Sequence, residues 1–73
     1  MTYEEMIQAW KDKSLVTYDG LTYEILSPKA IDSSGYRKEI FIVRQVTING
    51  QFGPIEIDKR VWDGMSLKGD KEK

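Results

Sequence analysis

Residues 15–26 read LVTYDGLTYEIL, two runs of β-forming residues around the dipeptide Asp19-Gly20. Asp-Gly between alternating apolar residues is the strongest short-range signal for a β-hairpin with a two-residue type I′ loop. That loop sets a register of cross-strand pairs: Tyr18 with Leu21, Thr17 with Thr22 and Val16 with Tyr23. Because this register gathers the large apolar side chains on one face, the stretch predicts a hairpin that covers a hydrophobic core.

A short helix is predicted in front of this hairpin. Thr2-Tyr3-Glu4-Glu5 matches the capping box, in which a Thr and a Glu three residues later satisfy the first backbone N–H groups of a helix. Apolar residues then recur at helical spacing: Tyr3, Met6, Ile7 and Trp10. A helix of about ten residues is marginal alone, so we expect Met6 and Trp10 to pack against the sheet.

The chain after the hairpin predicts a loop and a second hairpin. Pro28 and the cluster Asp32-Ser33-Ser34-Gly35 indicate a loop over Ser27 to Tyr36. A strand over about Arg37 to Ile48 follows. Residues 40–43 place apolar side chains on both faces of this strand, which predicts that it is the central strand. Asn49-Gly50 predicts another type I′ loop into residues 51–58. Its register has four pairs: Ile48 with Gln51, Val46 with Gly53, Arg44 with Ile55 and Ile42 with Ile57.

Proline and aspartate indicate how the sheet ends. Pro54 cannot donate a hydrogen bond, which predicts that the stretch 51–54 lies at a sheet edge. Asp58 either caps a helical turn over Lys59–Trp62 or precedes a short fifth strand over residues 60–62. The predicted fold class is therefore α+β, with a short N-terminal helix packed on a four- to five-stranded antiparallel meander. One form of this fold curls the sheet into an SH3-like small barrel. Residues 1–67 form one domain, and residues 68–73 form a charged flexible tail.

Composition argues against an enzyme. The chain has no cysteine and no histidine, which removes thiolate nucleophiles, imidazole bases and their zinc sites. No serine lies in a nucleophile-elbow motif, and the dispersed glycines match no phosphate-binding loop. We therefore expect no catalytic residue, no cofactor and no metal. The lack of disulfides and of any long apolar segment predicts a cytoplasmic protein without membrane contact.

Charge is distributed unevenly along the chain. Residues 1–36 carry three lysines and six acids, for −3, whereas residues 37–60 carry five cations and three acids, for +2. A two-charge excess is small for nucleic-acid binding, which normally uses a strongly basic face. The sequence therefore favours a non-enzymatic protein-binding module or regulator that acts through a sheet edge and an aromatic–basic patch, with self-association to a homodimer as one form. The alternative is a small-barrel nucleic-acid-binding protein.

Six residues are the candidates for partner binding, since aromatic and arginine side chains dominate interface energetics. They are Tyr36, Arg37, Phe52, Pro54, Arg60 and Trp62. Trp62 and Arg44 each allow a second interpretation. Trp62 also suits the closure of a small core. Arg44 falls on the apolar face of the predicted register, unless a bulge at Arg44-Gln45 turns it to the other face.

Overall fold

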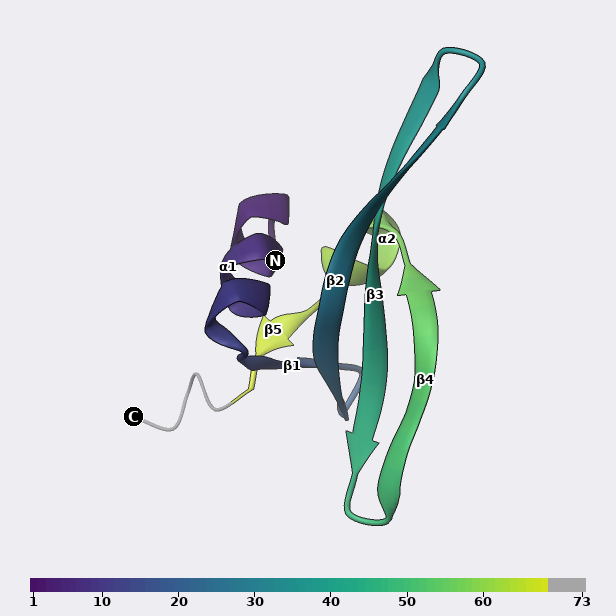
Figure 1. Cartoon of the computed structure of the whole chain (residues 1–73). Helices are drawn as coiled ribbons and strands as arrows, with labels where there is room; N and C mark the ends of the chain where they lie inside the picture. The colour runs from purple at the N-terminus through teal and green to yellow at the C-terminus, as the bar shows by residue number, and fades with distance from the viewer. Residues whose placement is uncertain (69–73) are drawn as a thin grey trace.

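The computed structural model describes residues 1–68, and they form two helices and one antiparallel sheet of five strands. In chain order the elements are α1 (Tyr3–Asp12), β1 (Leu15–Tyr18), β2 (Leu21–Ser33), β3 (Tyr36–Thr47), β4 (Gly50–Ile57), α2 (Lys59–Trp62) and β5 (Ser66–Leu67). The strand order is β4-β3-β2-β1-β5, and α1 covers one face of the sheet (Figure 1). The predicted α+β class is confirmed, but the sheet is not closed into a barrel, because its end strands β4 and β5 do not pair.

Helix α1 begins and ends as its sequence dictates. The Thr2 hydroxyl accepts from Glu5 N at 3.1 Å, and the Glu5 carboxylate accepts from Thr2 N at 2.8 Å, completing the capping box. Lys13 ends the helix with a left-handed φ of 59°. Met6 is fully buried, and the Trp10 indole donates to the carbonyl of Leu26 in β2 at 2.9 Å. The helix is thus fixed to the sheet by packing and by a hydrogen bond.

The first hairpin has the predicted register, with Val16 opposite Tyr23 and positive φ at Asp19 (54°) and Gly20 (81°). The loop predicted over 27–36 is wrong, because β2 continues to Ser33. Only Ser34 and Gly35, with φ of 49° and 78°, form the turn. Pro28 is tolerated because β2 pairs with β1 only as far as Glu24. Beyond that point a missing N–H on that side costs no sheet hydrogen bond.

The register predicted for the second hairpin is also wrong. Ile48 and Asn49 form the loop, so Thr47 pairs with Gly50. A register shift follows, in which Gly53 and Pro54 of β4 lie opposite Arg44 alone. Gly53 fits there because its φ is +126° and the Arg44 Cα lies only 3.2 Å from where a Cβ would stand. The prediction that Pro54 lies at an edge is confirmed, since β4 is an end strand.

Arg44 is turned away from the α1-covered face. It stands opposite Glu24 in β2, and the two side chains form an ion pair of 2.7 Å. The shift between Val43 and Gln45 brings Ile57 opposite Phe41, so that apolar residues of β3 and β4 meet on the helix side. The bulge considered from sequence is therefore present, but its extra residue belongs to β4.

The core lies between α1, α2 and the middle of the sheet. Its fully buried side chains are Met6, Val16, Phe41 and Val43. Trp62 of α2 is 4% exposed, and its ring meets Phe41 edge-on at 4.9 Å between centroids. Of the two predicted roles for Trp62, closure of the core is therefore confirmed. Asp58 caps α2 by accepting from Arg60 N, and the fifth strand forms at Ser66–Leu67 instead of 60–62.

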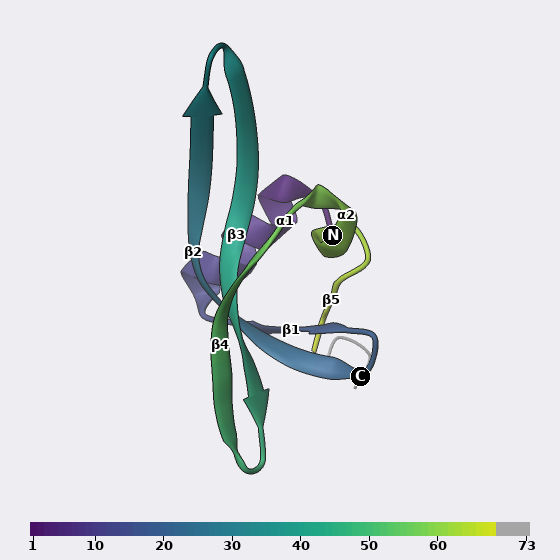
Figure 2. The ribbon, with the colours of Figure 1, turned by 90° about the vertical axis from the view of Figure 1, so that its right-hand side faces the viewer.

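The molecule is elongated, measuring 44 × 26 × 21 Å. The β2–β3 hairpin projects beyond the core at one end, and the β3–β4 hairpin projects at the other (Figures 1 and 2). The predicted tail 68–73 lies outside the described residues, apart from Lys68, whose N–H donates to the Leu15 carbonyl at 3.0 Å. Within residues 1–68, no helix has the length and apolar character needed to cross a membrane.

Candidate functional site

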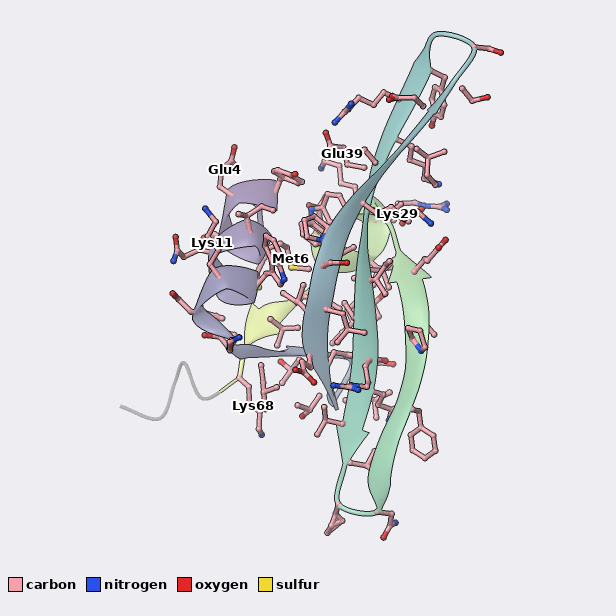
Figure 3. All side chains as sticks on the ribbon, in the orientation of Figure 1. Glu4, Met6, Lys11, Lys29, Glu39 and Lys68 are labelled. Atoms are coloured by element: carbon pink, nitrogen blue, oxygen red, sulfur yellow. The ribbon has the colours of Figure 1, made fainter. Side chains whose placement is uncertain are left out.

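A groove of about 440 Å³ lies where the base of the β2–β3 hairpin faces α2. We call it the β3–α2 groove. Its lining residues come from three parts of the chain, namely Tyr3, the segment Tyr36–Glu39, and α2 with its cap: Asp58, Lys59, Arg60 and Trp62. Glu39 is visible at the base of the projecting hairpin in Figure 3.

The groove exists because β3 and β4 diverge. Their pairing ends at Phe41 opposite Ile57, and the chain then turns at Asp58 into α2. β3 runs on toward Tyr36, paired with β2 alone. Figure 2 shows the chain after β4 bending away from β3 toward α2. One wall of the groove is therefore the edge of β3, and the opposite wall is a helical turn.

The floor of the groove is aromatic. The Tyr3 ring lies 5.5 Å from Phe41 and 6.1 Å from Trp62 between centroids, in tilted arrangements. Burial raises the pKa of the Tyr3 hydroxyl, and the neighbouring Glu39 carboxylate raises it further. Tyr3 is therefore protonated at neutral pH, as an ordinary tyrosine is, and its hydroxyl is directed to the Glu39 carboxylate at the edge of the groove.

The rim carries four cations, and acids partner each of them. Lys59 pairs with Asp63 at 2.8 Å, Arg60 and Lys38 pair with Asp58 at 3.3 and 3.7 Å, and Arg37 pairs with Glu39 at 3.4 Å and Asp32 at 3.6 Å. The cationic side chains are 43–90% exposed, whereas Asp58 is 21% exposed. Ion pairs of exposed cations are weak and can exchange partners.

Asp58 links the cap of α2 to the rim. Burial would raise the pKa of its carboxyl, but the hydrogen bond and charge of Arg60, together with Lys38, outweigh burial and lower the pKa below its ordinary value. The carboxylate is thus ionised at neutral pH. It forms ion pairs with Arg60 and Lys38, and it accepts a hydrogen bond from the Arg60 N–H in the first turn of α2.

The structure brings four of the six predicted residues to this groove: Tyr36, Arg37, Arg60 and Trp62. Tyr36 is 63% exposed, whereas Trp62 is 4% exposed and contributes little surface to the groove because it belongs to the core. The other groove residues, Tyr3, Lys38, Glu39, Asp58 and Lys59, were not among the six candidates. Tyr3 lies on the apolar stripe of α1, which indicated packing alone, and Lys59 carried one available signal, its place beside Arg60.

Phe52 and Pro54 do not join this site. Both lie exposed on β4, toward the Ile48-Asn49 turn at the other end of the molecule. Phe52 is 58% exposed and Ile48 is 90% exposed, and no charged residue occurs between Gln45 and Ile55. We call this region the apolar end.

Acidic side chains and serines are the groups in this chain that could bind a metal or act as nucleophiles. No three acidic side chains within residues 1–68 come together as metal ligands would. In the groove, Glu39 and Asp58 are each held by a cation, and no serine lines it. The arrangement is suited to holding a ligand through an aromatic floor and exchangeable charges.

No protein-family model, curated protein or solved structure that was compared with the chain matches it.

Proposed function

We propose that this protein is a non-enzymatic binding module that holds a segment of a partner protein in the β3–α2 groove. The observation that carries the proposal is the convergence of Tyr36, Arg37 and Arg60 on one groove with an aromatic floor. Exposed aromatic and arginine side chains around a desolvated centre are the usual composition of protein-binding hot spots.

Charge favours a protein partner over a nucleic acid. The groove lining has four cations and two acids, 4 − 2 = +2. Asp32 and Asp63 lie outside the lining and pair with Arg37 and Lys59. Nucleic-acid binding normally uses a strongly basic face, because each phosphate contact releases counterions, and an excess of two charges is small for it. A protein segment with one or two carboxylates matches an excess of two.

The composition of the chain supports a role without catalysis. It contains neither histidine nor cysteine, and the groove has no nucleophile paired with a base. The side chains that line the groove are suited to recognising a partner.

The test is a selection from a library of random twelve-residue peptides on the immobilised protein, beside gel shifts with mixed-sequence DNA and RNA at low salt. We expect enriched peptides whose affinity falls about tenfold in Arg60→Ala, because hot-spot truncations cost at least that much. Lys11→Ala removes the same charge from the exposed side of α1 and serves as the matched control. Absence of any enriched peptide, together with micromolar nucleic-acid binding that weakens with salt, would replace this proposal by the nucleic-acid alternative.

A further inference from the structure

The edge of β3 that forms one wall of the groove has unused backbone hydrogen-bonding groups. Residues Tyr36–Ile40 pair with β2, from Ser33 opposite Tyr36 to Lys29 opposite Ile40. Within residues 1–68 they have no strand on their other side, because β4 pairs with β3 only from Phe41 onward. In an antiparallel ladder every second residue directs its N–H and C=O to each side. This short edge therefore presents free donors and acceptors to the groove.

The free edge is shaped like a vacant strand position. Had β4 continued past Ile57, its next residues would lie beside Tyr36–Ile40. The chain instead leaves the sheet at Asp58 and forms α2 on the far side of the gap. The resulting space of about 440 Å³ is bounded by the β3 edge, the aromatic floor and α2. An exposed edge of this kind is a template for an added strand.

We propose that the partner binds here by strand addition, as an extended segment that pairs with Tyr36–Ile40 and continues the sheet where β4 leaves it. This inference rests on the proposed function and specifies its geometry. The edge supplies backbone hydrogen bonds, and the floor formed by Tyr3 and Trp62 receives alternate side chains of the added strand.

Charge complementarity defines the chemistry of that segment. The groove lining carries +2, while the whole chain carries −1, so the remainder of the protein carries −1 − 2 = −3. The groove is therefore a positive site on a negative protein. Lys59 and Arg60 are highly exposed there, with side-chain exposures of 74% and 90%. The segment that fits alternates apolar or aromatic residues, for the floor, with one or two acidic residues, for Lys59 and Arg60.

The other sheet edges lack this combination of features. β5 is only two residues long, and β4 is interrupted by Pro54, which cannot donate to an added strand. In the described part of the chain, β2 has no strand on its β1 side after Glu24, but Pro28 interrupts that stretch and the β3–α2 groove does not border it. The β3 edge combines free backbone, an aromatic floor and charge in one place.

The experiment uses the strongest peptide from the random-library selection and a set of analogues, each N-methylated at one position. N-methylation removes one backbone donor and leaves every side chain in place. We expect affinity to fall about tenfold or more at alternate positions and to change little between them, since only every second N–H faces the edge. In amide hydrogen exchange, the free-side amides of Tyr36–Ile40 should become protected on binding, and those of β4 should not.

The outcomes separate this inference from the proposed function. Peptides that bind and respond to Arg60→Ala, but show no alternation on N-methylation and no protection over Tyr36–Ile40, would overturn strand addition and leave the groove as the binding site. Selected peptides that are basic would overturn the partner chemistry, and peptides that protect β4 instead of Tyr36–Ile40 would overturn the location. If no peptide is selected at all, both proposals fail.

Discussion

The two ends of β3 differ in what they present to solvent, although both belong to projecting hairpins. At the Tyr36 end, β3 borders a groove with charged rims and ion pairs. At the Thr47 end, the chain from Gln45 to Ile55 has no charged residue, and Ile48 and Phe52 are exposed. The difference indicates that exposed aromatics alone do not define a site. A groove, a free strand edge and exchangeable charges coincide only at the Tyr36 end.

The largest expected effect is on the free energy of unfolding, and it distinguishes Trp62 from Phe52, which the sequence placed together among the partner-binding candidates. Trp62→Ala should lower the free energy of unfolding by about 3–5 kcal/mol, because a buried ring packed on Phe41 is lost and a cavity remains. Phe52→Ala at the apolar end should change it by only about 0.5 kcal/mol, since that side chain is mostly exposed. Urea unfolding monitored by circular dichroism measures both. Equal losses would refute the assignment of Trp62 to the core.

A second comparison concerns glycines in the two projecting hairpins. Gly53→Ala should cost about 2–3 kcal/mol, because φ is +126° and the new Cβ would stand 3.2 Å from the Arg44 Cα and 3.3 Å from the Val43 carbonyl oxygen. Gly35→Ala should cost about 1–2 kcal/mol, since its φ is +78° but nothing lies within 4 Å of the new Cβ. Thermal or urea unfolding compares the two variants. The register shift at Gly53 would be wrong if that substitution were the milder one.

The smallest expected effect is a pH dependence at the groove. The folded-state pKa of Asp58 is lowered, so its contribution to stability is present above the ordinary aspartate pKa and is lost as pH falls through the folded value. Asp58→Asn keeps an oxygen for the α2 cap but removes the charge. The free energy of unfolding should therefore decrease less steeply between neutral pH and about pH 3 in this variant than in the parent, as measured by urea unfolding at each pH. Parallel pH profiles would show that the Arg60 and Lys38 pairs add nothing to stability.

Local signals in the sequence predicted most of the fold. The capping box and the apolar stripe define α1, and Asp19-Gly20 fixes the first hairpin because both residues tolerate a positive φ. The predicted register was wrong in the second hairpin, where two adjacent positions compete to form the turn. Asn49-Gly50 resembles a type I′ loop, but the chain turns one residue earlier. Gly53 then accommodates the extra residue of β4, because a residue without a Cβ can approach β3 this closely.

The candidate site was predictable in part. Tyr36, Arg37 and Arg60 were identified from residue type, and the structure brings them together across 23 positions of sequence between Arg37 and Arg60. The paired but open edge at Tyr36–Ile40 could not be anticipated, because it depends on β2 continuing to Ser33 through the stretch that was predicted to be a loop. Phe52 was assigned to the same patch because it is an aromatic beside Pro54 at a sheet edge, whereas its place opposite Gln45 puts it at the other end of β3.

The most direct test of the account is the affinity of the selected peptide for Tyr36→Ala and Phe52→Ala. These two aromatics have matched exposures, 63% and 58%, and lie at opposite ends of the molecule. If the partner occupies the β3–α2 groove, Tyr36→Ala should weaken binding about tenfold, and Phe52→Ala should leave it within about twofold. Isothermal titration calorimetry measures both on folded protein. A tenfold loss in Phe52→Ala, with Tyr36→Ala unchanged, would place the binding surface at the apolar end and contradict the account.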